Sequence, residues 1–299
     1  MSIVSVLATG GTIASRSGTG GAVAQDSGDD LVAGLGLPAE VEVRVRDVVR
    51  VGGFRMTLAH VHDVARAVAI ELADGVDGVV VTGAQRAADA PDSDGPRNLT
   101  DAITAAAAPT TRGLGVLIGF GGRLFPARGT RKTHTLAADT FTNPAGGPLG
   151  WVHGRDVGVV TEPRRAPALD LGAFDPAGVR VDVVPTYPDA DATALRACVD
   201  AGARGIVLEA TGAGNANPAI CHAVAEVTAA GIVVATSTRV AAGPVTPIYG
   251  DGGGVDLLAA GAVPSGLLRP SQARMLLAAL LGIRGDAEVV RREFAQRCG

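Results

Sequence analysis

Short runs rich in valine alternate along this chain with alanine-rich stretches of helical periodicity, and this alternation limits the folds that are open to it. The valine-rich runs have the length of strands and span residues 4–8, 41–45, 78–82, 115–120, 180–184, 205–209 and 231–235. The longer stretches have helical spacing and span residues 57–73, 98–107, 192–201, 218–230, 270–281 and 286–297. Strands that alternate with helices are typical of mostly parallel sheets covered by helices. The sequence therefore predicts an α/β protein.

Chain length and composition predict two domains of this class. The hydrophobic content is 47% but aromatic residues make up only 3%, so the core consists of aliphatic side chains, as is usual in parallel sheets. A chain of 299 residues is near the size at which single cores divide. Residues 156–178 are rich in proline and arginine and have weak periodicity, which favours a linker. We predict a larger N-terminal domain over residues 1–155, with helices on both faces of a mostly parallel sheet, the linker over 156–178, and a smaller C-terminal α/β domain over 179–299.

Charge and cysteine usage exclude several classes of partner and location. The net charge is −4 without a cluster of lysine and arginine, which disfavours nucleic acid and anionic membranes and leaves small molecules. Cys198, Cys221 and Cys298 are widely spaced, so neither a disulfide framework nor a zinc site is expected. The apolar run near the N-terminus is interrupted by Ser5 and Thr9 and is interpreted as a strand, not a signal peptide. No run is long enough to span a bilayer. A cytoplasmic location is expected.

The sequence predicts neither a metal nor another cofactor. His60 and His62 have the closest spacing of the five histidines, but on a helix such side chains point apart. The loop over 212–217 is similar to a dinucleotide fingerprint, yet its last position is Asn217 instead of glycine, and no phosphate-binding G-x-x-x-x-G-K-[ST] occurs. Nucleotide binding is therefore disfavoured.

A hydroxyl-bearing turn follows the first predicted strand. Thr9, Gly10, Gly11 and Thr12 lie at the carboxyl end of that strand, which is where ligands bind in open α/β sheets. Two glycines permit a sharp turn and a close approach to a substrate. Thr12 is the candidate nucleophile. The alternative is an ordinary strand-to-helix turn without chemistry.

Two further polar segments contain candidate catalytic groups. Lys132 lies in the polar stretch 128–135 and is a candidate base if burial or neighbouring groups favour its neutral form; the alternative is a solvated basic loop. The stretch 82–96 follows a strand and contains several aspartates up to Asp94. Those carboxylates either face a substrate amine or cap a helix, which is the commoner use.

Four motifs in series resemble the bacterial L-asparaginase (asparaginase/glutaminase) family. They cover residues 7–14, 83–86 with 94–99, 132–135 and 212–215, in the order of the family and through nearly the whole chain. The resemblance implies a two-domain α/β hydrolase that deamidates L-asparagine to L-aspartate and ammonia through a threonine nucleophile and a covalent acyl-enzyme. It also implies a homotetramer, built as a dimer of dimers, with each site at an intimate dimer interface.

Site residues are carried over where this sequence matches the motifs. Thr12 matches the primary nucleophile, and Lys132 matches the lysine of the second catalytic set. The backbone amides at Gly11 and Thr12 are expected to help hold an oxyanion. Asn217 resembles the asparagine that reaches the substrate amine across the dimer interface, and Tyr249 falls near another interface position.

One family motif is missing from this chain. Family members have a His-Gly-Thr-Asp-Thr motif after a strand like residues 79–82, and it supplies a second threonine and the aspartate that partners the lysine. Here Thr82 is followed directly by Gly83, Ala84, Gln85 and Arg86, which in the family follow a later strand of similar sequence. We interpret this as the loss of one helix-plus-strand unit of about thirty residues.

This loss has consequences for both chemistry and structure. Lys132 loses the groups that orient it, and Gly53 stands where the family has a serine that binds the substrate carboxylate. An alternative function is therefore an asparaginase-like protein of impaired activity that binds an amino acid or acts as a structural subunit. The strands on either side of the lost unit must also either pair with each other or leave backbone groups without sheet partners.

Overall fold

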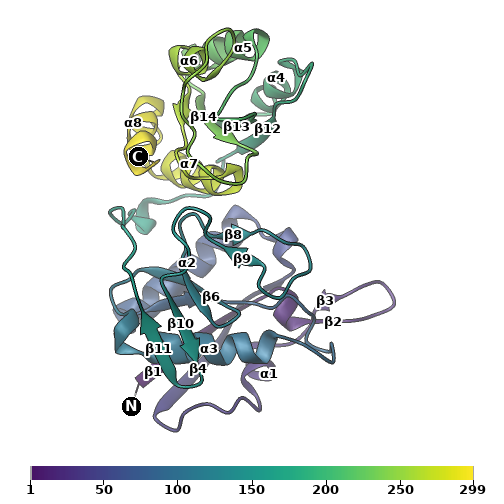
Figure 1. Cartoon of the computed structure of the whole chain (residues 1–299), viewed down its shortest axis with the longest axis vertical. Coiled ribbons are helices and arrows are strands. Elements are labelled where there is room, and N and C mark those ends of the chain that lie inside the picture. The colour runs from purple at the N-terminus through teal and green to yellow at the C-terminus, as the bar shows by residue number, and fades with distance from the viewer. Residues whose placement is uncertain (1, 299) are drawn as a thin grey trace. The chain divides into compact units, whose positions relative to one another are not determined.

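A computed structural model describes residues 2–298, and the chain divides into two compact units at Arg165 and Ala166 (Figure 1). Each unit combines a β-sheet with helices, as predicted. The boundary lies later than the start of the predicted linker, because Asp156–Val159 forms strand β11 of unit 1. This strand pairs with β10 (Gly150–His153) across a two-residue turn in which Gly154 has a φ of 61°. Its four residues are too few to give a clear sequence period.

The strands of unit 1 form two main sheets instead of the single, mostly parallel sheet expected. Strands β1 (Ser2–Gly10) and β4 (Val41–Val51) form a parallel pair. The second sheet has the order β11-β10-β7-β6-β5, in which β5 and β6 are parallel and the other neighbours are antiparallel. Its remaining strands are β5 (Val79–Val81), β6 (Val116–Phe120) and β7 (Arg123–Pro126). Two short hairpins complete the set: β2 (Ser15–Arg16) with β3 (Val23–Ala24), and β8 (Arg131–Lys132) with β9 (Phe141–Thr142).

The helices of unit 1 bury its core unequally. Helix α3 (Gly95–Ala107) packs on β1, β5 and β6, and its Leu99 and Ile103 are buried with Val4 of β1. Helix α2 (Leu58–Ala73) packs on β1 and β4, yet Ala67 is the one residue of this helix that is buried. The other helical segments are α1 (Gly28–Val32), η1 (Thr12–Ala14), η2 (Gly53–Arg55) and η3 (Pro109–Thr111).

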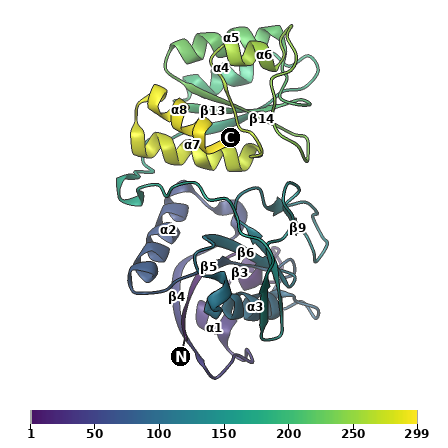
Figure 2. The same ribbon diagram turned by 60° about the vertical axis from the view of Figure 1, so that its left-hand side comes forward.

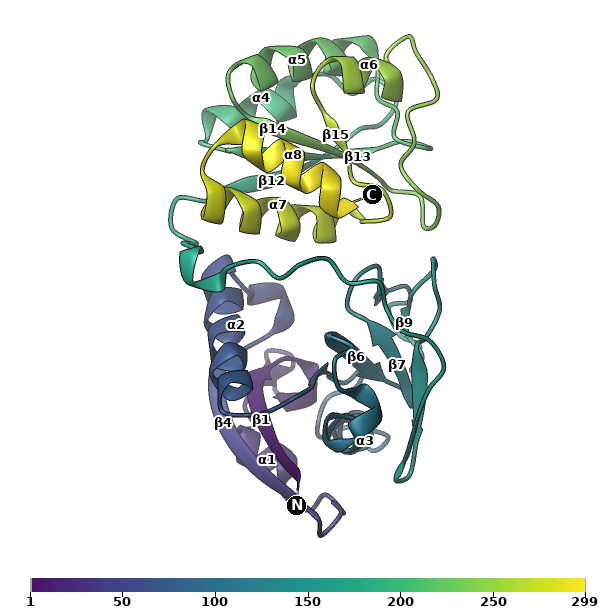
Figure 3. The ribbon, with the colours of Figure 1, turned by 90° about the vertical axis from the view of Figure 1, so that its left-hand side faces the viewer.

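The two main sheets of unit 1 do not join. Within residues 2–298, β1 pairs with β4 alone and β5 pairs with β6 alone. Figure 3 shows β1 with β4 on one side of unit 1 and β6 with β7 on the other. The strands next to the lost segment have therefore not paired with each other. This is the second of the two outcomes that the sequence allowed.

Unit 2 is a three-layer α/β domain. Its parallel sheet has the order β12-β13-β14-β15, with strands Val181–Pro185, Gly205–Ala210, Val233–Thr238 and Val263–Pro264. Figure 2 shows α4 (Thr193–Asp200), α5 (Pro218–Ala229) and α6 (Gly254–Ala259) on one face, and α7 (Pro270–Arg284) and α8 (Ala287–Cys298) on the other. The 3-10 turn η4 (Leu171–Ala173) precedes the sheet. Leu277 and Leu280 of α7 are fully buried in the core of this unit.

No helix among residues 2–298 has the length and apolar character needed to cross a membrane.

Candidate active site

The turn that presents Thr12 is held tightly against β4. Gly10 has a φ of 85°, and a Cβ atom there would lie 2.6 Å from the carbonyl oxygen of Val51. The amide of Gly11 donates a hydrogen bond of 2.8 Å to the same oxygen. Only glycine combines this backbone conformation with so close an approach. The predicted turn is therefore a rigid extension of the β1–β4 pair.

Thr12 itself is exposed at the carboxyl end of β1. It opens the 3-10 turn η1, in which the hydroxyl of Ser15 donates a hydrogen bond of 2.8 Å to the carbonyl of Gly11. Ala14 of this turn is fully buried, so one side of the turn is anchored while the side chain of Thr12 faces solvent. The amide of Gly11 is already bonded to Val51. An oxyanion contact would therefore fall to the amide of Thr12.

Lys132 lies on a short exposed hairpin. It pairs with Phe141 across β8 and β9, and the amide of Thr133 donates a hydrogen bond of 2.8 Å to the carbonyl of Thr140. The side chain of Lys132 is exposed and has neither an ion pair nor a hydrogen bond within residues 2–298. Among the described residues, this lysine therefore has neither a carboxylate nor a hydroxyl partner.

The loop between β5 and α3 contacts both the Thr12 segment and the Lys132 segment. The amide of Ala88 donates a hydrogen bond of 2.8 Å to the carbonyl of Ser15, three residues after Thr12. From the same loop, the side-chain amide of Gln85 donates to the carbonyl of Thr135, three residues after Lys132. The segments that contain the two candidate catalytic residues are therefore linked through one loop.

The carboxylates of this loop bind backbone amides and do not contact the candidate base, Lys132. Asp94 accepts hydrogen bonds of 2.9 to 3.0 Å from the amides of Gln85 and Arg86 and one of 3.0 Å from the Asn98 side chain. Asp89 accepts a hydrogen bond of 2.8 Å from the amide of Ser17, and this bond lowers the pKa of Asp89. Asp94 is the N-cap residue of α3, but its side chain accepts no capping hydrogen bond from the helix backbone. The structure therefore gives these carboxylates a third use, the organisation of the loop backbone.

Both asparagines of the unit 2 motif fix the starts of helices. Asn217 is the N-cap of α5: its Oδ1 accepts 3.0 Å from the amide of Ile220, and its Nδ2 donates 2.7 Å to the carbonyl of Ala190. Asn215, which the sequence reasoning left without a role, accepts a hydrogen bond of 3.0 Å from the amide of Gly254 at the start of α6. The Gly-Asn pair indicates a turn in the sequence, but the contact with α6, which lies 39 residues away, has no local signal.

Tyr249 and Gly53 lie in exposed loops. Tyr249 of unit 2 is 59% exposed, and its carbonyl accepts a hydrogen bond of 3.0 Å from the amide of Val255. Gly53 begins η2 in unit 1, where the next residue, Phe54, is 92% exposed. No hydroxyl therefore occupies the position at which the resemblance implies a carboxylate-binding serine.

No group of three or more histidine, cysteine, aspartate or glutamate side chains in the described part of the chain is arranged to hold a metal ion.

Family models match both units. The model described as "Asparaginase, N-terminal" matches residues 3–82 and 78–165, and the one described as "Glutaminase/Asparaginase C-terminal domain" matches residues 180–294. The chain belongs to the asparaginase family. The resemblance of the four motifs is thereby confirmed, together with the two-domain asparaginase-like fold.

Individual asparaginases and related proteins support this assignment. The probable L-asparaginase of Deinococcus radiodurans is 36% identical over 73% of this chain and 67% of its own length. A glutamyl-tRNA(Gln) amidotransferase subunit from Methanothermobacter thermautotrophicus is 29% identical over 96% of this chain and 74% of its own. A crystal structure of the probable cytoplasmic L-asparaginase from Campylobacter jejuni superposes with a TM-score of 0.84 at 26% identity, covering 98% of this chain and 99% of that chain.

The matches also support the loss of a segment in this asparaginase. Residues 78–82 are matched twice by the N-terminal family model, once at the end of the first segment and once at the start of the second. The alignment with the amidotransferase protein extends over 323 positions, more than the 299 residues of the chain. The chain therefore lacks residues that its relatives have, and one strand sequence fits two places in the family pattern.

Proposed function

We propose that this asparaginase-family chain hydrolyses L-asparagine to L-aspartate and ammonia with Thr12 as the nucleophile. The observation that carries the proposal is the anchored turn: β4 and the Ser15 hydroxyl hold its backbone, while the Thr12 hydroxyl stands exposed at the carboxyl end of β1. Nucleophilic catalysis needs a hydroxyl whose position does not depend on a mobile loop.

The reaction has two acyl-transfer steps. In the first, the oxygen of Thr12 forms a bond to the side-chain amide carbon of asparagine, and the C–N bond breaks. The hydroxyl proton passes to the leaving nitrogen, which departs as ammonia. In the second step, water adds to the acyl carbon, the ester bond breaks, and the proton from water restores the Thr12 hydroxyl. We assign the stabilisation of the oxyanion in both steps to the backbone amide of Thr12.

We propose Lys132 as the base that assists these proton transfers. The segments after Thr12 and Lys132 both contact the loop between β5 and α3, and this supports a common site. General acid-base assistance contributes about 10² to 10⁴-fold in rate. Replacement of Lys132 by glutamine should therefore lower kcat by about 10² to 10⁴-fold.

A second candidate function is binding of an amino acid without turnover. The exposed, unpartnered side chain of Lys132 and the missing hydroxyl at Gly53 favour it. Calorimetric titration with L-aspartate distinguishes the two functions when it is combined with an assay of turnover. Binding without ammonia release supports the second candidate.

The decisive experiment measures ammonia release from L-asparagine by the purified chain and by Thr12→Ala and Thr12→Ser variants. Removal of the nucleophile should lower kcat by several powers of ten, whereas serine keeps a hydroxyl at the same atom position and should retain part of the activity. Circular dichroism checks that each variant is folded. Equal rates for the wild type and Thr12→Ala would refute the role of Thr12. L-Glutamine, assayed in parallel, defines the substrate preference.

Assembly and location are proposed from the family. We infer a homotetramer, a dimer of dimers, in which Asn217 and Tyr249 contribute to the substrate site across the dimer interface; light scattering of the purified chain tests its mass. We also infer a cytoplasmic location, which three dispersed cysteines and the probable cytoplasmic asparaginase of Campylobacter jejuni support. Fractionation of the producing cells tests that inference.

A further inference from the structure

A cavity of about 300 Å³ separates the two main sheets of unit 1. Residues 3–10, along β1, form one wall, and residues 78–82, along β5, form the other. Apolar side chains of α2 and α3 contribute to the lining, among them Val64, Val68 and Ile103. Its volume is at the lower end of the range of ligand pockets, about 300–1,000 Å³. Two strands that each lack a neighbour on one side therefore border the same space.

The two bordering strands run in the same direction. A Cβ atom on Gly95 would lie 2.9 Å from Ile13, which follows β1, and 3.5 Å from Ala84, which follows β5. The segments that follow the carboxyl ends of β1 and β5 thus lie close together beside Gly95. The amino ends of both strands lie near the last turns of α3: Val4 of β1 packs in one cluster with Ile103 and Ala106, and a Cβ atom on Gly78, just before β5, would lie 3.7 Å from the carbonyl oxygen of Ala106. A strand placed between them can accept hydrogen bonds from, and donate them to, both neighbours in parallel register.

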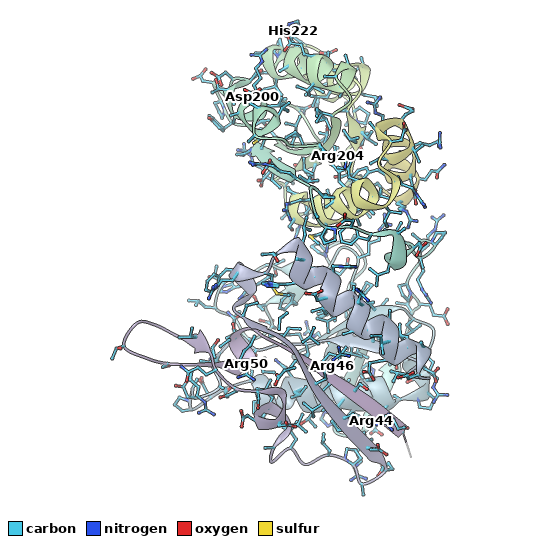
Figure 4. All side chains as sticks on the ribbon, turned by 180° about the vertical axis from the view of Figure 1, so that it is seen from behind. Arg44, Arg46, Arg50, Asp200, Arg204 and His222 are labelled. Atoms are coloured by element: carbon cyan, nitrogen blue, oxygen red, sulfur yellow. The ribbon has the colours of Figure 1, made fainter. Side chains whose placement is uncertain are left out.

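The outer strand of the β1–β4 pair carries several charged side chains, whereas the cavity lining has one ionisable side chain, that of Glu71. Figure 4 shows Arg44, Arg46 and Arg50 along β4, and Arg44 and Arg50 pair with acidic residues of the same strand at 3.1 Å. Charged side chains on edge strands oppose pairing with further strands. In the cavity, the polar side chains of Ser5 and Glu71 hydrogen bond to each other, and most of the lining is apolar. Charge thus disfavours strand addition at β4 and permits it at the cavity.

Apolar side chains around the cavity lack the cover that folded proteins normally provide. Val81 of β5 is 52% exposed, and Leu72 of α2, which also lines the cavity, is 43% exposed. Removing this apolar surface from water would favour the binding of a partner. A strand that occupies the cavity would cover both α2 and β5.

The family match indicates which sequence fits. Residues 78–82 match the N-terminal model at the end of the segment that includes β1, and again at the start of the segment that includes β6. In the structure, residues 79–81 form β5 beside β6, which corresponds to the second of these two matches. A second strand of the same type, Gly-Val-Val-Val-Thr, would therefore occupy the first place, beside β1.

We propose that this cavity is a binding site for an extended peptide strand of the β5 type, supplied by a separate polypeptide and not by a second copy of this chain. Its backbone bonds to the free edges of β1 and β5, and its alternating valines contact α2 on one side and α3 on the other. The bound strand would join the two sheets of unit 1 into one continuous sheet. This inference does not depend on the chemistry of Thr12.

The experiment titrates the full chain with a fluorescently labelled peptide of residues 74–84, Asp-Gly-Val-Asp-Gly-Val-Val-Val-Thr-Gly-Ala, followed by anisotropy. A matched peptide carries proline at the position of Val80, which removes one backbone donor and bends the strand. We expect saturable binding of the first peptide and at least a tenfold weaker affinity for the proline peptide. Equal affinity for both peptides would overturn the proposal.

Two variants on one helix locate the binding. Val68→Asp places a charge in the cavity wall, whereas Ile70→Asp changes a residue of α2 that is 47% exposed and does not contribute to the lining. The first variant should lose at least tenfold in affinity, and the second should bind as the wild type does. Equal affinities for two folded variants would contradict the proposed location.

Hydrogen exchange keeps the test decisive if Val68→Asp fails to fold. With wild-type chain, the peptide should slow exchange in residues 3–9 and 79–81; unchanged exchange there would refute strand addition. Slowed exchange that appears without peptide, and that grows with protein concentration, would assign the cavity to a second copy of the chain and overturn the proposal. Thr12→Ala should bind the peptide as the wild type does, so a failure of the proposed catalysis is distinguishable.

Discussion

The turn that presents Thr12 contains two neighbouring glycines with similar φ angles and different steric surroundings. Gly10 and Gly11 have φ angles of 85° and 77°. A Cβ atom on Gly10 would lie 2.6 Å from the oxygen and 2.7 Å from the nitrogen of Val51, whereas a Cβ atom on Gly11 would meet nothing within 4 Å. Gly10→Ala and Gly11→Ala therefore introduce the same methyl group into a similar backbone conformation, with and without a steric clash.

The structure gives a magnitude for the difference. A sparsely populated backbone conformation costs about 1–3 kcal/mol for a residue with a side chain, and this cost applies to both variants. Overpacking adds about 1–3 kcal/mol, and it applies to Gly10 alone because the atoms of Val51 belong to the backbone of β4. The effect of alanine on the unfolded chain is common to both and cancels. Gly10→Ala should therefore destabilise unit 1 by about 1–3 kcal/mol more than Gly11→Ala.

Urea denaturation followed by tryptophan fluorescence measures this difference. Trp151 is the single tryptophan of the chain and lies on β10 of unit 1, so its emission reports that unit. Free energies of unfolding follow from linear extrapolation at a common m-value. Equal destabilisation by the two substitutions, or a larger effect at Gly11, would refute the view that close approach to Val51 holds the Thr12 turn.

Three further predictions concern unit 2. Asn217→Ala should destabilise unit 2 by about 1–2 kcal/mol, because the substitution removes the N-cap of α5 and the hydrogen bond to Ala190. Asn217→Asp keeps the capping oxygen and should cost less. Circular dichroism during denaturation measures both variants. Burial, followed by the charge of Asp256, raises the pKa of Cys221 to about 11, so the thiol loses its proton at a lower pH in the unfolded chain than in the folded one. The contribution of this thiol to the free energy of unfolding is complete below about pH 9 and should be lost as the pH rises to 11. Thermal denaturation between pH 8 and 11 should show a shallower loss for Cys221→Ala, and an unchanged slope would contradict this account. Phe294→Ala should cost about 3–5 kcal/mol because the ring is fully buried, and a loss under 1 kcal/mol would contradict its place in the core.

Local sequence patterns predicted the six longest helices and most long strands, but not the short helices α1 and α6. Helix α5 was expected over residues 218–230 and spans Pro218–Ala229, because proline at its first turn and the capping Asn217 mark its start. Strand β11 was assigned to a linker instead, since four residues with a glycine carry little periodicity. The antiparallel part of the second sheet depends on such short strands, and for that reason unit 1 was expected to be mostly parallel.

Some features of the candidate site were predictable from local sequence, and others depend on distant residues. The glycines of the Thr12 turn are local signals, because a positive φ is a property of a single residue. The exposure of Lys132 and the use of Asn215 as a partner of α6 depend on residues far away in the chain. Motif spacing alone does not contain that information.

By itself the sequence determined the α/β class, the positions of the longer helices, membership of the asparaginase family and the lack of a segment that relatives have, because these properties depend on local periodicity and motif order. Tertiary structure alone decided that β1 and β5 stay unpaired with each other and border a cavity. Strand pairing joins backbone groups that are distant in the chain. Whether β1 and β5 pair therefore depends on how α2 and α3 pack against them. Because β1 and β5 do not pair, a cavity bordered by two sheet edges lies beside the turn that presents Thr12.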